Sequence, residues 1–544
     1  MQTRQEILKE LAKEVFDVVI IGGGITGAGI ALDAASRGIK VALIEKNDYA
    51  SGTSSKSTKL IHGGLRYLKQ LNFGLVAKTG RERAIIHRIA PHLVLPDKMI
   101  LPFFKGGTFG KFSTRLGLFM YDTLAGVSGE DRFKIFSPAQ TKRMIPMLDS
   151  RGLSGSGFYA EYRTDDARLT IENIKKAAEF GAVCTNYCKC TDITYADGLV
   201  NGIEAMDEET GDSFNINAKV VVNAAGPWVD EVRSLDELED SDKKLVLSKG
   251  VHLVFDRAKF PIDHTVYFDK GDGRLIFAVP RNNTVYVGTT DTIHTDSPDK
   301  LKVSEWDVDY ILEGIHNKFS KLSLSKEDVL STWVGVRPLI YEEGKDVTEI
   351  SRKDEIFVAR SGLITIAGGK LTGYRHMAKE IISTFLDQLD GSYSKCKTEN
   401  IKLTTKPFKD SKSVQTAVVQ ISKQIRNTMV PDWMGPYLIY NYGNTAFDII
   451  ANVNPEDLNL ETITMAELTY TIDHESVRTL LDFYERRTGR LYFEIESIIP
   501  TLDSISDIAR KKLGWSKDQE QDEIQLIRDT VVAQTTFVTE LEPA

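Results

Sequence analysis

The hydrophobic pattern at the start of the chain predicts a strand, a helix and a second strand. Residues 16–21 (FDVVII) and 41–46 (VALIEK) are short apolar runs rich in β-branched residues, which is typical of buried parallel strands. Between them lies an alanine-rich stretch, residues 28–37 (AGIALDAASR), which we predict to be helical. Before the first run, residues 1–16 read as a short amphipathic helix, without the apolar stretch of a signal peptide.

Three later segments also predict strands. Residues 182–217 alternate between apolar and polar positions, with Asp-Gly and Thr-Gly pairs as turn signals, which predicts a meander of strands. Residues 219–230 (KVVVNAAGPWVD) predict a buried strand that ends in a turn of small residues. Residues 362–376 (GLITIAGGKLTGYRH) predict a strand, a Gly-Gly turn and a helix that begins near Leu371.

The last quarter of the chain has a different pattern. Residues 390–413 are polar and lysine-rich, as expected of a linker. Beyond them, windows such as 413–425 and 474–487 show the i, i+3, i+4 spacing of amphipathic helices. We therefore expect a helical domain at the C-terminal end.

Length and composition narrow the class of protein. A chain of 544 residues is too long for one hydrophobic core, and 42% hydrophobic with 27% charged residues is ordinary for a soluble globular protein. The net charge of -9 argues against nucleic-acid binding, and it means that an anionic substrate needs a local basic pocket. No run of about 20 apolar residues predicts a membrane span.

The four cysteines predict neither a disulfide framework nor a metal site. Even-numbered spacing puts Cys184, Cys188 and Cys190 on one face if the segment is a strand, but a Cys-x-x-Cys pair and a fourth ligand are missing. We expect no bound metal and a reducing, cytoplasmic environment.

The glycine turn after the first strand points to dinucleotide binding. Gly22, Gly24 and Gly27 form a G-x-G-x-x-G motif between the predicted strand and helix, and Glu45 ends the second strand. The first glycine makes the turn, the second lets the backbone approach a pyrophosphate, and the third allows close helix packing. The helix N-terminus offers free N–H groups to the phosphates, and Glu45 accepts from the ribose hydroxyls.

Distant segments favour FAD over NAD. A second glycine turn and helix near residue 370 lie about 340 positions after the motif. A flavin enzyme needs such a distant element to close over its long cofactor, whereas an NAD enzyme does not. Residues 47–67 (NDYASGTSSKSTKLIHGGLRY) are dense in serine, threonine and glycine, which suits a loop that runs along a phosphate and ribityl chain.

These motifs resemble those of a known family. The stretches are IIGGGITGAGIALDAASRG, TSSKSTKLIHGGLRYL, DDARLTIENIKKA, NAAGPWVD, VGTTDT, GVRPL and AGGKLTGYR. In this order they resemble the flavin-dependent glycerol-3-phosphate dehydrogenases and α-glycerophosphate oxidases, from about Phe16 to Arg375. Residues 467–494 also resemble that family's helical C-terminal domain.

The resemblance implies an α/β fold in which a Rossmann-like FAD-binding domain is interleaved with a β-sheet substrate-binding cap. We expect the FAD-binding domain at residues 1–95, 155–245 and 335–389 and the cap at 96–154 and 246–334. The linker at 390–413 and a helical domain at 414–544 complete the chain. The resemblance also implies a homodimer.

The expected reaction is oxidation of sn-glycerol 3-phosphate to dihydroxyacetone phosphate. Such a site needs a base for the hydroxyl proton and cations for the phosphate. His62 is either that base or a residue that positions the flavin ring. The candidate substrate ligands are Arg66, Tyr67, Arg337, Arg352 and Lys370. Arg337 is also a candidate catalytic residue that stabilises the developing alkoxide, and Tyr67 and Tyr374 either cap the pocket or pack as aromatic residues.

The expected FAD contacts come from four segments. They are Gly22, Gly24, Ile25, Thr26, Gly27, Glu45, Lys46, Thr53, Ser54, Ser55, Leu60, His62, Gly63, Gly64, Ala225, Gly226, Trp228, Gly369, Lys370, Leu371 and Thr372.

The electron acceptor is left open between a membrane quinone and O2, which would give H2O2. A short connection between GVRPL and AGGKLTG favours the quinone-linked dehydrogenase. Residues 99–121 mix aromatic or apolar side chains with cations, as in a peripheral contact with the inner face of the cell membrane, although a buried cap segment explains them too. These residues are Phe103, Phe104, Phe109, Phe112, Phe119 and Met120 with Lys105, Lys111 and Arg115. An FAD-dependent amino-acid or amine oxidase and a flavin-bearing membrane scaffold without turnover are the further alternatives.

Overall fold

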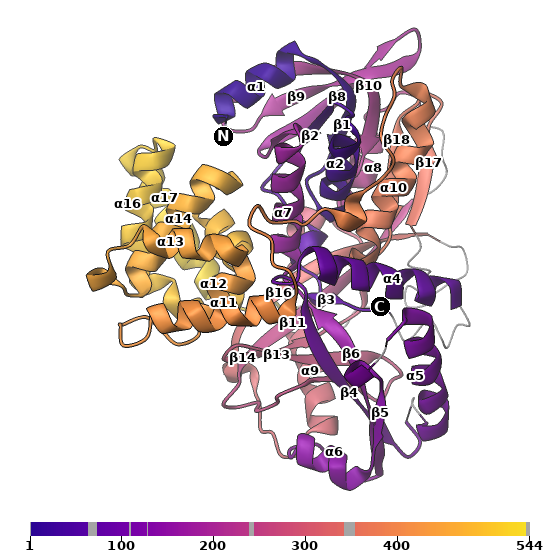
Figure 1. Cartoon of the computed structure of the whole chain (residues 1–544), viewed down its shortest axis with the longest axis vertical. Coiled ribbons are helices and arrows are strands. Elements are labelled where there is room, and N and C mark those ends of the chain that lie inside the picture. Colours follow the sequence, from indigo (N-terminus) through magenta and orange to yellow (C-terminus); the bar gives the residue numbers. More distant parts are fainter. Residues whose placement is uncertain are drawn as a thin grey trace.

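The computed structural model describes residues 2–63, 73–107, 110–127, 129–238, 244–341 and 354–539. The described chain forms two β-sheets, one above the other in Figure 1, and a group of C-terminal helices beside them.

The first sheet has the predicted N-terminal strand–helix–strand unit at its centre. Its strands are β1 (Val15–Ile21), β2 (Val41–Ile44), β7 (Val183–Thr185), β8 (Cys188–Ala196), β9 (Leu199–Asp207), β10 (Ser213–Asn223), β17 (Asp354–Val358) and β18 (Ile364–Gly368). The order is β17-β18-β10-β1-β2-β7, with β9 beside β10 and β8 beside β9. β18, β10, β1, β2 and β7 run parallel, so their carboxyl ends meet at one edge.

Helices cover both faces of this sheet, which explains the continuous apolar runs of β1 and β2. α2 (Ile25–Arg37), α7 (Asp166–Glu179) and α10 (Tyr374–Phe385) pack on one face (Figure 1). α1 (Arg4–Lys13) and α8 (Val229–Arg233) contribute Leu11 and Val232 to the core on the opposite face.

The second sheet forms the cap. Its strands are β3 (Leu60–Ile61), β4 (Leu95–Phe104), β5 (Lys134–Phe136), β6 (Leu153–Arg163), β11 (Leu245–Asp256), β12 (Thr265–Asp269), β13 (Leu275–Arg281), β14 (Thr284–Gly288), β15 (Thr292–His294) and β16 (Val329–Ile340). The order is β15-β11-β14-β13-β12-β4-β6-β3, with β16 on β11 and β5 on β6. Around it lie α4 (Phe73–Ile89), α5 (Lys111–Ala125), α6 (Pro138–Met144) and α9 (Glu305–Lys318).

The long strands of the cap reach the first sheet. β11 and β16 pair from Leu245↔Ile340 to Phe255↔Val329. At the far end of this ribbon, Ile340 shares a small apolar cluster with Ala367 of β18. Side chains on β11 and β16 therefore stand between the two sheets.

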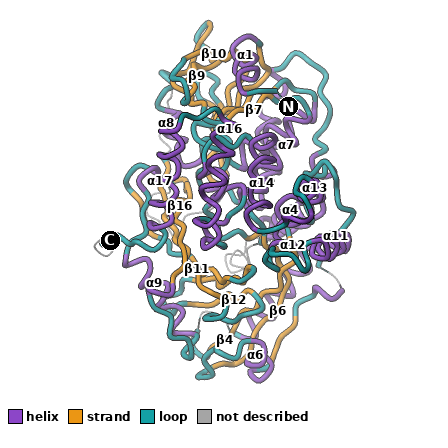
Figure 2. The backbone as a smooth tube through the Cα atoms, turned by 90° about the vertical axis from the view of Figure 1, so that its left-hand side faces the viewer, coloured by secondary structure: helices purple, strands orange, loops and turns teal. Residues whose placement is uncertain are grey.

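The C-terminal region packs on the cap. Its helices are α11 (Ser411–Gln424), α12 (Met434–Tyr442), α13 (Ala446–Ala451), α14 (Leu460–Glu475), α15 (Arg490–Phe493), α16 (Leu502–Leu513) and α17 (Lys517–Ala533), and Figure 2 looks at the side that carries them. Trp333 of β16 and Tyr286 of β14 lie in one buried cluster with Phe483, Tyr492 and Ile527.

The predicted mixed α/β fold with a helical C-terminal region is confirmed. One predicted element is wrong, because no continuous amphipathic α-helix covers the described residues 474–487. α14 ends at Glu475, Ser476 takes a left-handed backbone with φ of 56°, and Asp482–Arg487 form a π-helix. The domain boundaries stay predictions. Residues 390–410 contain one short 3-10 turn among the described secondary structure, yet Leu403 is buried in the core of the first sheet. Among the described helices, none has the length and apolar character needed to cross a membrane.

Candidate active site

A cavity of about 910 Å³ lies between the two sheets. It is bounded by the carboxyl ends of the parallel strands on one side and by β11, β12, β13 and β16 on the other. Its size is at the upper end of the range for ligand sites, as an extended ligand requires. The predicted residues on its wall are Gly22, Gly24, Ile25, Thr26, Glu45, Lys46, Thr53, Ser54, Leu60, His62, Ala225, Gly226, Trp228, Arg337, Gly369, Lys370, Leu371 and Thr372.

Some predicted residues lie elsewhere. Of the described ones, Gly27, Ser55 and Gly63 stand behind the wall rather than on it. Tyr374 is 1% exposed in the core of the first sheet, against Gly29, so packing accounts for it. Gly64, Arg66, Tyr67 and Arg352 lie outside the described residues.

The glycine turn is built for close approach. Gly22 has φ of +114°, and a Cβ there would lie 2.6 Å from Ala224 O. A Cβ on Gly27 would lie 1.9 Å from Gly22 O, so this glycine lets the first turn of α2 pack against the loop. The N-terminus of α2 therefore opens into the cavity with its backbone N–H groups, which is a ready site for a pyrophosphate.

Glu45 stands beside this turn. Its Oε2 accepts from Gly23 N at 2.7 Å and its Oε1 from Asn47 N at 3.0 Å. Desolvation raises the pKa of this carboxyl, while the two backbone N–H groups work against that rise. The carboxylate is thus fixed at the cavity wall, as a ribose-binding acid must be.

The segment 51–58 lines the cavity and is hydrogen-bonded to α2 and to β16. Ser54 Oγ accepts from Ile25 N at 2.9 Å, at the start of α2. Thr53 Oγ1 donates to Val336 O at 2.7 Å, next to Arg337 on β16. Hydroxyl side chains of this segment hold the helix N-terminus and the cap strand in register.

The second glycine turn closes the far side. Gly368 and Gly369 both have positive φ, +76° and +86°, and they lead from β18 into a 3-10 turn at Leu371–Gly373 and then into α10. Thr372 Oγ1 donates to His62 O at 3.2 Å. This bond brings the predicted catalytic segment and the second turn side by side.

Arg337 is the predicted cation on the cap side of the cavity. Its Nη1 donates to Asp291 Oδ1 at 3.3 Å, and the two side chains are 25% and 15% exposed. Gly250 on the neighbouring strand β11, which pairs with Gly335 of β16, leaves room for the guanidinium. A Cβ on Gly250 would lie 3.1 Å from Arg337 Nη2.

His62 faces the cap. Its ring lies 6.0 Å from the Phe277 ring in an edge contact, and Phe277 in turn stacks on Tyr267 at 4.0 Å. Gly63, the residue after His62, is fixed by a buried network. Its backbone N–H donates to Tyr121 OH at 3.0 Å, and Arg83 Nη1 donates to Tyr121 OH and, at 2.5 Å, to Glu161.

The sequence analysis missed several residues of the wall. They are Lys56, Lys189, Tyr267, Arg274, Phe277 and Asp291. Lys189, Tyr267 and Phe277 stand on β8, β12 and β13, and Arg274 lies in the turn before β13, where no motif marks them. Lys56 and Asp291 lie inside the quoted stretches TSSKSTKLIHGGLRYL and VGTTDT, so their place in these motifs is the signal that could have pointed to them.

The residues on the wall fit FAD. A glycine cradle and a helix N-terminus suit a pyrophosphate, and Glu45 suits a ribose. The 51–58 segment, the second glycine turn, His62 and Arg337 line the same cavity, and its volume of about 910 Å³ leaves room for a flavin ring and a small substrate.

Comparison with known proteins agrees with this geometry. Residues 17–375 match the model of the FAD dependent oxidoreductase family, and residues 396–520 match the C-terminal domain of alpha-glycerophosphate oxidase. The chain is 48% identical to the aerobic glycerol-3-phosphate dehydrogenase of Staphylococcus aureus over 525 residues, which are 95% of this chain and 94% of that protein.

Solved structures show the same fold. The glycerol-3-phosphate dehydrogenase from Bacillus halodurans complexed with FAD has a TM-score of 0.83 at 35% identity, with 99% of each chain covered. L-alpha-glycerophosphate oxidase from Mycoplasma pneumoniae, with FAD bound, has a TM-score of 0.56 at 17% identity, covering 73% of this chain and 100% of that one. Glycine oxidase from Geobacillus kaustophilus has a TM-score of 0.53 at 20% identity, again over 73% and 100%. The predicted flavoprotein oxidoreductase and its FAD cofactor are confirmed.

Proposed function

Because the chain belongs to the FAD-dependent oxidoreductase family that includes the aerobic glycerol-3-phosphate dehydrogenases, we propose that it oxidises sn-glycerol 3-phosphate to dihydroxyacetone phosphate. The observation that carries this proposal is that Arg337, Lys370 and Arg274 all line the cavity. Cations on the cavity wall suit a phosphate dianion in a protein whose net charge is -9.

Each residue has a role in this proposal. Bound FAD supplies the two-electron acceptor. Arg337 donates two hydrogen bonds to the phosphate or to the oxygen that becomes the carbonyl, and Lys370 adds a second positive charge. His62 accepts the hydroxyl proton. The stacked rings of Tyr267 and Phe277 keep water away from the reacting carbon.

We propose a membrane quinone as the electron acceptor. A surface helix supports the membrane contact that this acceptor requires. On α5 the exposed residues Phe112, Leu116 and Phe119 are 83%, 52% and 51% exposed, and Lys111 and Arg115 are exposed among them. Rings and cations on one helix face suit an interface with anionic lipid.

The rest of the predicted aromatic segment has a different place. Phe103 is buried in the cap, Phe104 and Met120 pack partly against cap clusters, and Phe109 lies outside the described residues. The proposed contact is therefore limited to the outer face of α5 and to the exposed Lys105 before it.

Steady-state turnover with a soluble dye tests the substrate. We expect activity with sn-glycerol 3-phosphate and a kcat/KM lower by at least about a hundredfold with glycerol, which lacks the phosphate. Turnover of glycine or a D-amino acid in place of glycerol 3-phosphate would contradict the proposal and favour an amino-acid oxidase. Peroxide formation in air at the rate of dye reduction would identify O2 as the acceptor instead of quinone.

A further inference from the structure

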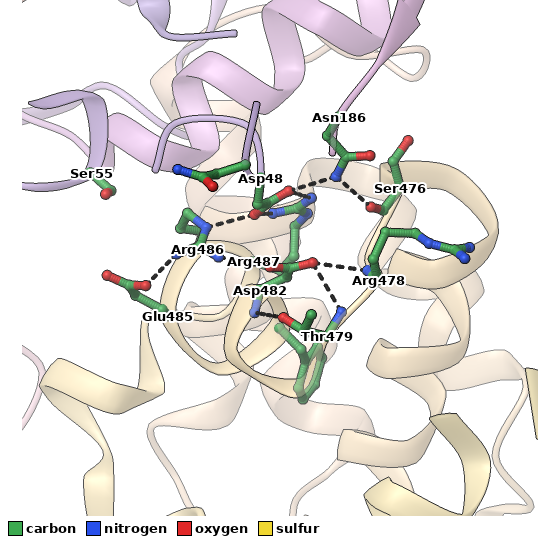
Figure 3. A network of polar contacts seen from close by, with 12 residues as sticks. Asp48, Ser55, Asn186, Ser476, Arg478, Thr479, Asp482, Glu485, Arg486 and Arg487 are labelled. Atoms are coloured by element: carbon green, nitrogen blue, oxygen red, sulfur yellow. Dashed lines mark hydrogen bonds and ion pairs between the residues drawn. The ribbon is translucent and has the colours of Figure 1, made fainter. Parts of the chain in front are cut away.

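The cavity segment between Glu45 and Leu60 is held from outside by the C-terminal region. Two residues form the contacts, Asp48 at its start and Lys56 beyond its middle. Their partners lie more than 420 positions later in the chain, on and beside the π-helix Asp482–Arg487 (Figure 3). We call residues 46–59 the cavity loop.

Asp48 is fully buried and accepts from two arginines. Arg487 donates through Nη1 at 2.7 Å and Nη2 at 2.8 Å, and Arg486 donates through Nε at 2.6 Å. Asn186 Nδ2 adds a further bond at 2.9 Å. Figure 3 shows the two neighbouring arginines converging on this carboxylate, which the wider π-helical turn permits.

Lys56 carries the second contact. Its ammonium pairs with Glu485 and lies 2.5 Å from the Tyr492 hydroxyl, which itself donates to Glu485 at 2.5 Å. Glu485 also accepts from Arg486, so both contacts of the cavity loop end in one connected network. Lys56 lines the cavity, whereas Glu485 and Tyr492 stand behind it.

Residues 51–54, between the two contacts, line the cavity. Ser54 bonds the first residue of α2 and Thr53 bonds β16. A shift of Lys56 would move Ser54 and Thr53, because only one or two residues stand between them and Lys56. Gly335 adds a steric constraint, since a Cβ there would lie 2.4 Å from Lys56 Cβ.

We propose that Glu485 is a positioning residue of the cofactor site and that it acts through Lys56. The C-terminal region then belongs to the scaffold of the FAD cavity, and its ion pair with the cavity loop contributes to FAD affinity. This inference depends on FAD binding and not on the substrate, so its failure would leave the proposed reaction untouched.

A double-mutant cycle in FAD affinity tests it. Full-length wild type, Glu485→Gln, Lys56→Gln and the double variant are freed of flavin, and FAD is titrated back by the quenching of its fluorescence. We expect Glu485→Gln alone to weaken FAD binding about tenfold, because it leaves the Lys56 charge beside Arg486. In the Lys56→Gln background the same change should have almost no further effect.

Two features separate positioning from general destabilisation. The FAD-free variants are checked by circular dichroism to be folded at the assay temperature. Asp473→Asn serves as the matched control, because its carboxylate pairs with Lys512 on the outside of the same region, and its FAD affinity should equal that of wild type. Equal loss from Glu485→Gln with and without Lys56, or no loss at all, would overturn the proposal.

Tyr492→Phe covers the case in which Glu485→Gln does not fold. It removes one hydroxyl and leaves every charge in place, so folding should be retained. We expect FAD binding weaker by at least about fivefold, because the lost hydroxyl is hydrogen-bonded to the Glu485 carboxylate and to the Lys56 ammonium. Unchanged FAD affinity in this variant would overturn the proposal as well.

Discussion

Arg337 Nη1 lies 3.3 Å from Asp291 Oδ1, and this pair stands on the cap side of the FAD cavity. The Asp291 carboxylate also accepts from the Ser248 hydroxyl. Ser248 lies on β11 opposite Arg337 of β16, so this bond fixes the carboxylate beside the arginine. The pair orients a guanidinium toward the space where we place the substrate.

Replacing Arg337 by lysine should lower kcat/KM for glycerol 3-phosphate about a hundredfold, because a lysine cannot make the two parallel hydrogen bonds of the arginine fork. Asp291→Asn should cost about tenfold or less, since it loosens the arginine without removing it. Flavin content should stay at the wild-type level in both. Arg337→Lys with unchanged kcat/KM would place the phosphate elsewhere.

Gly250→Ala should have a similar effect without touching a charge. The new methyl group would lie 2.5 Å from Thr289 Oγ1 and 3.1 Å from Arg337 Nη2, so the Thr289 side chain must move and the guanidinium must give way by a few tenths of an ångström. We expect KM to rise several-fold with FAD still bound, measured by dye-linked kinetics. Gly117→Ala on α5 is the control, because a Cβ there meets no described atom within 4 Å and should leave KM unchanged.

His62→Asn separates the two roles of this histidine. If His62 takes the hydroxyl proton, kcat should fall about 10²-fold or more while FAD affinity stays near the wild-type value. A loss of FAD affinity with little change in the rate of flavin reduction would mean that the ring positions the cofactor instead. Fluorescence titration and single-turnover reduction measure the two quantities separately.

Asp48 predicts a pH dependence of stability. Burial alone would raise its pKa, but the charges of Arg487 and Arg486 prevail and lower the pKa to about 2. An acid with a pKa lowered on folding stabilises the protein above its unfolded value of about 3.9, and this stabilisation is lost as the pH falls toward 2. At neutral pH, Asp48→Asn should destabilise the fold by about 3–5 kcal/mol, because it leaves buried Arg487 without its short carboxylate contact and removes one of the carboxylates that pair with Arg486.

The difference in the free energy of unfolding between wild type and Asp48→Asn should therefore shrink as the pH is lowered from about 5 to about 3. Thermal melting across this range measures it. Asp473→Asn, which changes an exposed ion pair, should show the same pH dependence of the melting temperature as wild type. A gap between wild type and Asp48→Asn that is the same at both ends of the range would contradict the ion-pair account.

The outer face of α5 predicts binding to anionic membranes. Charge reversal of Lys105, Lys111 and Arg115 should reduce sedimentation with anionic vesicles and leave dye-linked activity unchanged, because these side chains are exposed and lie away from the cavity. Wild type should also lose binding at high salt. Vesicle binding by the reversed variant equal to that of wild type would exclude this face as the contact.

Much of the fold could be predicted from the sequence because its signals are local. A β-branched run followed by Gly22, Gly24 and Gly27 specifies a strand, a close turn and a helix within 25 residues. The second turn at Gly368–Gly369 was visible for the same reason, since only glycine adopts these positive φ angles without strain. The spacing of apolar residues at 474–487 indicates an α-helix, and this prediction is wrong. Residues Asp482–Arg487 form a π-helix, in which Arg486 and Arg487 donate to the distant carboxylate of Asp48.

The cavity itself was only partly predictable. Residues inside motifs, such as Glu45, Ser54 and Lys370, were found because the motif fixes their place. Arg274 lies in no motif, and Lys56 and Asp291 lie in motifs that do not show what their side chains contact. Their role depends on how the cap strands and the C-terminal region fold back over the first sheet. Such long-range pairing leaves no periodic mark in a single sequence.

Anaerobic mixing of the purified holoenzyme with sn-glycerol 3-phosphate in a stopped-flow spectrophotometer tests the central claim most directly. The account predicts rapid loss of the visible absorption of oxidised flavin, about a hundredfold slower at subsaturating substrate in the Arg337→Lys variant. Flavin that stays oxidised with glycerol 3-phosphate, but is reduced by glycine or a D-amino acid, would contradict it.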